Sequence, residues 1–108
     1  MSPPLRRTPR LSSGQRKYLR GLAHPLQASV LVGKEGITEN LVASADANLE
    51  CHELIKVKFV ASKEEKEALI EELAGVLGAA LAGLIGHVAI LYRPCREEDK
   101  RRVVLPEG

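Results

Sequence analysis

The chain has 108 residues, 44% of them apolar and 28% charged, with a formal net charge of +2. This balance predicts one globular domain. It excludes a membrane-spanning protein, because no apolar run approaches the roughly 20 residues that a span needs. No secretory signal is recognisable, and Cys51 and Cys95 form no CxxC pair, so we expect a cytoplasmic protein with reduced thiols.

Positive charge is concentrated at the start of the chain. Residues 1–34 contain no acidic residue, whereas residues 35–54 contain no lysine or arginine. Such segregation can build a local positive patch without a large net charge, although acidic helices are also ordinary solvated surfaces. We interpret residues 1–10 as a disordered basic arm, residues 11–95 as the folded domain and residues 96–108 as a charged tail. The arm contains Arg6, Arg7 and Arg10.

The first predicted elements are a helix and a strand. Ser12 and Gln15 have the spacing of a capping box, which begins a helix at Ser12. This helix ends near Ala23, because Pro25 disfavours helical geometry at the residue before it. Residues 28–32 are apolar and partly β-branched, which predicts a strand buried on both faces.

A second helix follows a short loop. Thr38 is a suitable N-cap, and Ile37 and Val42 have the spacing of a hydrophobic staple. The inward stripe at steps of four consists of Leu41, Ala45 and Leu49. The acidic residues that this stripe leaves outside are Glu39, Asp46 and Glu50.

The second half predicts a strand, a helix and a hairpin. Residues 54–60 alternate, with apolar residues on one face and Lys56 and Lys58 on the other. Ser62 and Glu65 have capping-box spacing for a helix over residues 63–77.

Gly78 is a natural stop for this helix, and Gly86-His87 predicts a tight turn between strands 79–85 and 88–92. Residues 103–105 are a candidate edge segment. The predicted fold is therefore α/β in the order α-β-α-β-α-β-β, with a mixed four-stranded sheet and packed helices.

Four runs of the chain resemble the YhbY family of bacterial stand-alone CRM domains. In chain order the runs are LRGLAHPL (19–26), VGKEGIT (32–38), HELIKVK (52–58), and IG (85–86) through LYRP (91–94). The resemblance spans about residues 11–105. The alanine-rich run 79–84 and the proline-arginine arm depart from the family pattern.

The resemblance implies a fold similar to the C-terminal domain of the third bacterial translation initiation factor. It also implies an RNA-binding module, since stand-alone family members associate with precursors of the large ribosomal subunit. Related domains occur in plant organellar intron-splicing factors. We therefore expect a monomeric ribosome assembly factor whose partner is ribosomal RNA. A general RNA chaperone and a protein-interaction module that uses the acidic helices are the alternatives.

The family's GxxG loop corresponds here to Gly33-Lys34-Glu35-Gly36. Two glycines let a backbone approach a phosphate closely, and the following helix N-terminus favours an anion. Lys34 adds a cation, whereas Glu35 opposes one. The alternative is that the motif is only a tight turn. A second GxxG at residues 83–86 has apolar middle residues, and we interpret it as structural.

Further candidate RNA contacts are basic residues outside this loop. They are Arg16, Lys17, Arg20, Lys56, Lys58 and Arg93. Exposed lysines on a strand can equally serve solubility and edge protection. We expect no metal, cofactor or catalytic site, because His24, His52 and His87 lack ligand spacing and no nucleophile motif is evident. Few aromatic residues are present, which favours recognition of RNA backbone and shape.

Overall fold

The computed structural model describes residues 9–60, 63–95, 99, 101 and 103–106. Its elements are α1 (Ser13–Ala23), β1 (Val30–Val32), α2 (Glu39–His52), β2 (Leu54–Phe59), α3 (Lys63–Leu77), β3 (Ala80–Ile85) and β4 (Val88–Tyr92). This order confirms the predicted fold class. The basic arm up to residue 8 and most of the charged tail lie outside the described residues.

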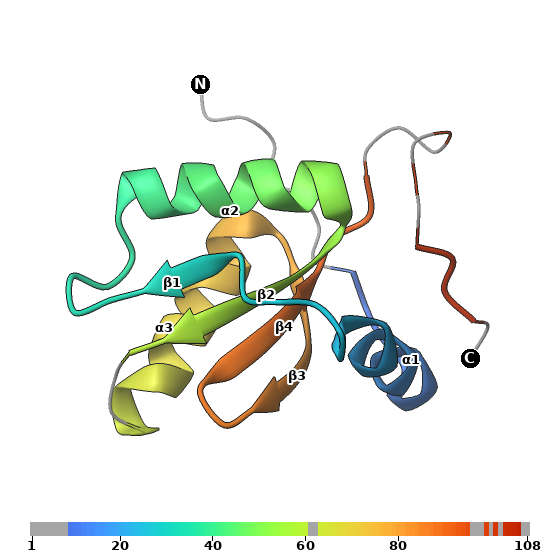
Figure 1. Ribbon diagram of the computed structural model, residues 1–108, viewed down its shortest axis with the longest axis horizontal. Helices are drawn as coiled ribbons and strands as arrows, with labels where there is room; N and C mark the ends of the chain where they lie inside the picture. Colours follow the sequence, from blue (N-terminus) through green and yellow to red (C-terminus); the bar gives the residue numbers. More distant parts are fainter. Residues whose placement is uncertain (1–8, 61–62, 96–98, 100, 102, 107–108) are drawn as a thin grey trace.

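The strands form one mixed sheet in the order β1-β2-β4-β3 (Figure 1). β1 and β2 are parallel, whereas β4 is antiparallel to both β2 and β3. The parallel pair is joined through α2, because neighbouring parallel strands need a crossover that returns to the same end of the sheet. β3 and β4 form the predicted hairpin, and Gly86 in its turn has a φ of +61°.

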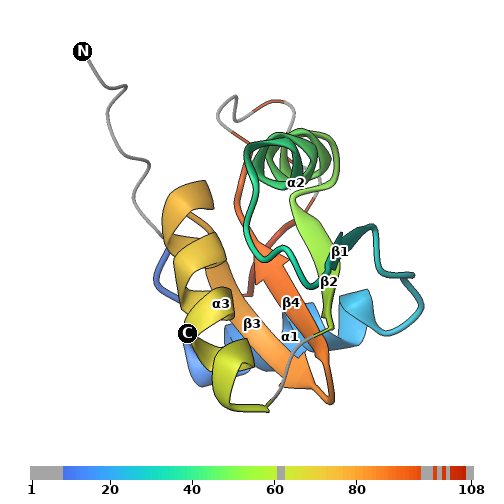
Figure 2. The same ribbon diagram turned by 90° about the vertical axis from the view of Figure 1, so that its left-hand side faces the viewer.

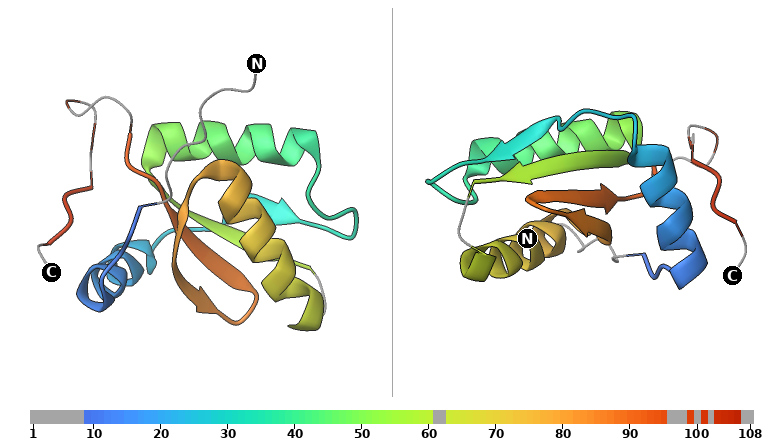
Figure 3. Two further views of the ribbon diagram at one scale, coloured as in Figure 1. Left: turned by 180° about the vertical axis from the view of Figure 1, so that it is seen from behind. Right: turned by 60° about the horizontal axis from the view of Figure 1, so that its bottom comes forward.

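The helices lie on both faces of the sheet. α2 and α3 cover one face and α1 covers part of the other (Figures 2 and 3). The larger apolar cluster includes Phe59 and Leu73 and lies beneath α2 and α3. A smaller cluster, which includes Leu19 and Ile90, lies beneath α1. α1 is therefore held by its own core and presents its basic side to solvent.

Local hydrogen bonds fix the helix ends where the sequence predicts them. The Ser12 Oγ accepts from the Gln15 backbone N–H at 3.1 Å, and the Gln15 Oε1 accepts from the Ser12 N–H at 3.0 Å. The Thr38 Oγ1 accepts from the Leu41 N–H at 3.1 Å. The reciprocal pair at Ser12 and the single bond at Thr38 satisfy amides that the first helical turn leaves without partners. The cap predicted at residue 62 lies outside the described residues.

The prediction that the first strand is buried on both faces is wrong. β1 has three residues and forms an edge of the sheet. Val30 and Val32 are buried, but the Leu31 side chain between them is 58% exposed. The reason is that α1 packs against β2, β3 and β4 and leaves the outer face of β1 uncovered.

The predicted edge segment at residues 103–105 is also wrong. This segment pairs with no strand and runs beside α1, where Val103 and Leu105 pack against the smaller cluster (Figure 1). Its backbone is held by Glu53, whose buried carboxylate accepts the Cys95 N–H at 2.8 Å and the Val103 N–H at 3.0 Å. Glu53 itself has a φ of +62°, in the left-handed region that ends α2.

Candidate nucleic-acid interface

The GxxG loop forms a tight turn between β1 and α2. The Gly36 N–H donates to the Gly33 carbonyl oxygen at 3.1 Å, and Gly36 has a φ of +76°. This conformation favours glycine, because a side chain would clash with the backbone. Two shallow hollows flank the turn, and Gly33, Lys34 and Gly36 line both of them. The loop is therefore an exposed projection at the edge of the sheet.

The electrostatics of this loop are mixed. Lys34 supplies a cation and the α2 N-terminus supplies partial positive charge. Glu35 lies within the turn, and Glu39 occupies the first turn of α2, where a carboxylate already interacts favourably with the helix dipole. A phosphate bound at this loop would therefore be attracted by Lys34 and the α2 N-terminus and repelled by the two nearby carboxylates.

The two β2 lysines have different environments, although both point to the outer face of the sheet. The Lys56 Nζ donates to the His24 oxygen at 3.1 Å and to the Leu26 oxygen at 2.9 Å. Its ammonium thereby fixes the connection between α1 and β1. The Lys58 side chain is exposed, and its ammonium has no hydrogen-bond partner among the described residues. Of the two, Lys58 is the one available to a ligand.

The three candidate cations of α1 are exposed. Arg20 lies over the sheet and its Nη1 donates to the Ala82 carbonyl oxygen at 3.2 Å. Arg16 makes a long contact of 3.5 Å from its Nη1 to the Leu11 carbonyl oxygen. Lys17 lines a hollow on the outer surface of the helix. α1 therefore carries a cationic surface beside the face on which Lys58 lies.

Arg93 does not join this surface, which argues against its predicted role as a phosphate contact. The residue is 3% exposed, and its guanidinium contacts Asp46 at 2.7 Å and Glu50 at 2.9 Å. It also donates to the Leu77 carbonyl oxygen at 2.9 Å. A guanidinium with these partners is a structural clamp between β4 and the two helices. Asp46 and Glu50, expected as outward-facing acids, are part of that clamp.

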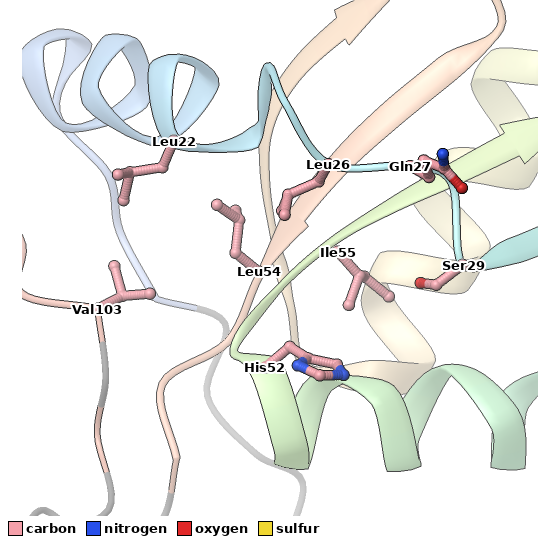
Figure 4. A pocket seen from close by; sticks show the side chains of 8 residues that line it. All are labelled: Leu22, Leu26, Gln27, Ser29, His52, Leu54, Ile55 and Val103. Carbon is pink, nitrogen blue, oxygen red and sulfur yellow. The ribbon is translucent and has the colours of Figure 1, made fainter.

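Sequence reasoning missed a pocket at the other end of β1 (Figure 4). Its residues come from α1, the connection before β1, the junction of α2 and β2, and the C-terminal segment. No motif links these segments in the sequence, so only the fold brings them together. Ser29 and His52 are among its polar residues. His52 begins the HELIKVK run, but nothing in that run indicates a pocket, and no local signal marks Ser29.

Metal-ligating residue types do not cluster in the described part of the chain. No group of three or more His, Cys, Asp or Glu residues there is arranged to hold a metal ion. Cys51 is exposed and Cys95 is buried, and the structure pairs neither in a disulfide. Burial raises the pKa of the Tyr92 hydroxyl, and the negative charge of Glu53 adds to that shift. Within the same residues, no helix is long and apolar enough to cross a membrane.

Comparison with known proteins places these features in a family. Residues 11–93 match the CRS1 / YhbY (CRM) domain. A Haemophilus influenzae protein named as an RNA-binding protein is 42% identical over 88 residues, which are 81% of this chain and 89% of the relative. Bacillus subtilis YqeI, described as a probable RNA-binding protein, is 32% identical over 97 residues, with coverage of 89% and 99%.

A solved structure agrees with these relatives. The solution structure of a hypothetical Staphylococcus aureus protein, described there as a candidate RNA-binding protein, superposes with a TM-score of 0.75 at 35% identity. The match covers 90% of this chain and 100% of that one. The four runs of the sequence, the strand order and the family match agree, and the chain belongs to the CRS1/YhbY (CRM) domain family.

Proposed function

We propose that the protein binds structured RNA and assists assembly of the large ribosomal subunit. RNA binding is supported by the names of its family relatives in Haemophilus influenzae and Bacillus subtilis. The observation that carries the proposal is the Gly33–Gly36 hydrogen-bonded turn directly before the capped N-terminus of α2. The proposed partner is ribosomal RNA in large-subunit precursors. We further propose that the protein is monomeric, cytoplasmic and non-enzymatic and that it uses no cofactor.

The proposed contact at the loop is with an RNA phosphate. Thr38 satisfies the N–H groups of Leu41 and Val42. The N–H groups of Glu39 and Asn40 have no acceptor among the described residues, so they are available to an anion. Lys34 adds its charge at the same place. The small turn lets a sugar-phosphate backbone approach without a steric barrier.

The second proposed contact is the outer face beside α1. Lys58 lies there with a free ammonium, and α1 adds Arg16, Lys17 and Arg20. Cations on neighbouring elements bind phosphates additively and release counterions. Phe59 and Tyr92 are buried, so no row of aromatic side chains is available for base stacking. This favours recognition of backbone and shape over recognition of sequence.

Crosslinking of the protein to RNA in its native cells, followed by sequencing, tests this function. Reads concentrated at one or a few sites of large-subunit ribosomal RNA are the expected result. Reads scattered over many transcripts would favour a general RNA chaperone. Recovery of proteins but no RNA above background would favour a protein-interaction module acting through the acidic helices.

A further inference from the structure

A pocket of about 350 Å³ opens where the connection before β1 meets the junction of α2 and β2 (Figure 4). Its apolar walls are Leu22, Leu26, Leu54, Ile55 and Val103. Leu22 and Leu26 are 38% and 42% exposed, so these walls are accessible from solvent. Pockets of roughly 300–1,000 Å³ with apolar walls and a few polar groups are typical of small-ligand sites.

Three polar side chains stand along one side of these walls, namely Gln27, Ser29 and His52 (Figure 4). They make no hydrogen bond with any residue that the structure describes. An amide, a hydroxyl and an imidazole together offer both donors and acceptors. A ligand suited to this pocket therefore has apolar faces and a polar edge that carries donors and acceptors of its own.

A second hollow adjoins the pocket on the outer surface of α1. Leu22 lines both hollows, and Lys17 and Tyr18 line the second one. The Tyr18 side chain is 41% exposed. Among the residues that the structure describes, no Asp or Glu lines either hollow, whereas Glu35 or Glu65 lines the hollows beside the GxxG loop. The α1 side is thus the better environment for a ligand that carries negative charge.

We propose that the pocket receives one unpaired nucleobase of the bound RNA, with the adjacent phosphate at Lys17. A base has two apolar faces for the leucine walls and a hydrogen-bonding edge for Gln27, Ser29 and His52. Its phosphate matches the positive charge of the adjoining hollow. An apolar side chain of a protein partner would use the walls but neither the polar side nor Lys17.

This inference rests on the proposed function and specifies it, because it names an unpaired nucleotide as the feature that is recognised. Unpairing a base costs free energy, and that cost is smallest where the base already lacks a partner. A helix with a single bulged nucleotide therefore presents the required ligand, whereas a fully paired helix does not.

The test compares two RNA hairpins that differ by one bulged adenosine, by fluorescence anisotropy with the full chain at matched salt. Ser29→Phe fills the pocket, since the Ser29 side chain points into it (Figure 4). Ser44→Phe places the same side chain on the exposed surface of α2 and is the matched control. Melting temperatures verify folding, and Gln27→Ala is a second variant that removes polar contact without adding bulk.

The wild type and Ser44→Phe should bind the bulged hairpin about tenfold more tightly than the paired one, which is the order of discrimination that one good hydrogen-bonded contact to a base edge supplies. Ser29→Phe should lose that preference and keep its affinity for the paired hairpin, and Gln27→Ala should reduce the preference.

Equal binding of both hairpins by the wild type would overturn the inference and leave the proposed function standing. Absence of binding to either hairpin would overturn both. If Ser29→Phe keeps the bulge preference but no longer co-sediments with large-subunit precursors, the pocket holds a protein side chain and the inference is wrong.

Discussion

The side chain of Arg20 lies directly over Gly83, across the space that a β-carbon would occupy. A Cβ atom at Gly83 would lie 2.5 Å from the Arg20 Cδ and 2.8 Å from its Cγ. Gly83 also lies at the register shift between β3 and β4. The second GxxG of the chain therefore has a packing role at its first glycine, in agreement with its structural interpretation.

Gly83→Ala should destabilise the wild type by about 1 kcal/mol, because Arg20 must leave its position and its hydrogen bond to Ala82. The same change in an Arg20→Ala background should be neutral or slightly stabilising, since the obstructing atoms are gone. Urea denaturation of the four proteins measures this coupling. Equal costs in both backgrounds would show that the close approach is unimportant.

Arg93→Met should destabilise the fold by about 2–3 kcal/mol, since it removes a buried cation from two carboxylates and from the Leu77 carbonyl. Arg16→Met, at an exposed position, should change stability by less than about 0.5 kcal/mol. Thermal unfolding distinguishes the two. At a temperature where the Arg93 variant and the wild type are both folded, their RNA affinities should be similar. A large loss of affinity in the Arg93 variant would indicate that Arg93 contacts RNA after all.

Lys34→Ala combined with Lys58→Ala should weaken RNA binding without unfolding the domain. Lys58 is chosen over Lys56, because Lys56 fixes the connection before β1. The slope of log affinity against log salt should become shallower by about 1.5, for two lost phosphate contacts. Ala43→Glu with Ala47→Glu, exposed on α2, changes net charge equally and is the control. Unchanged salt dependence in the lysine variant would refute the proposed contacts.

Glu53→Gln should loosen the C-terminal segment. Both carboxylate oxygens accept backbone N–H groups, from Cys95 and Val103, and an amide can accept at only one of them. We expect a loss of about 1–3 kcal/mol and faster amide hydrogen exchange at Cys95 or Val103. Glu67→Gln, exposed on α3, is the control and should change neither quantity. If the Cys95 and Val103 amides exchange as slowly in the Glu53 variant as in the wild type, the role assigned to this carboxylate is contradicted.

Stability should fall at alkaline pH in a way that depends on Tyr92. Burial, and then the charge of Glu53, raise its folded-state pKa above the ordinary value of 10.0. The unfolded chain therefore releases this proton first, and its stabilising contribution is lost as pH rises through and beyond 10.0. Tyr92→Phe should make the free energy of unfolding depend less on pH between about pH 9 and 11 than it does in the wild type. Tyr18→Phe, which makes the same substitution at an exposed position, is the matched control.

Helix ends could be predicted from the sequence because their hydrogen bonds are local. Gln15 lies three residues from Ser12, and Leu41 lies three residues from Thr38. The burial of β1 could not be predicted in the same way. An apolar run looks alike whether one face or two are covered, and the position of α1 decides that coverage.

The candidate site likewise has one part that could be predicted from the sequence and another that could not. The Gly33–Gly36 turn is visible in the sequence, because its glycines and the following cap are adjacent. The partners of Lys56 lie 32 and 30 positions away, and those of Arg93 on α2 lie 47 and 43 positions away. Charge type and strand alternation cannot distinguish a free cation from a bonded one, because only tertiary structure brings the acceptors near.

The short edge strand β1 sets a fixed separation between two different kinds of contact. Ser29 lines the pocket before β1 and Gly33 begins the loop after it, so the two points are about 13 Å apart at the rise of an extended chain. Pairing with β2 keeps β1 straight. An RNA that occupies both ends must present a phosphate and an unpaired base at that spacing. The domain would then select its RNA targets by the distance between an unpaired base and a phosphate, and only weakly by their base sequence.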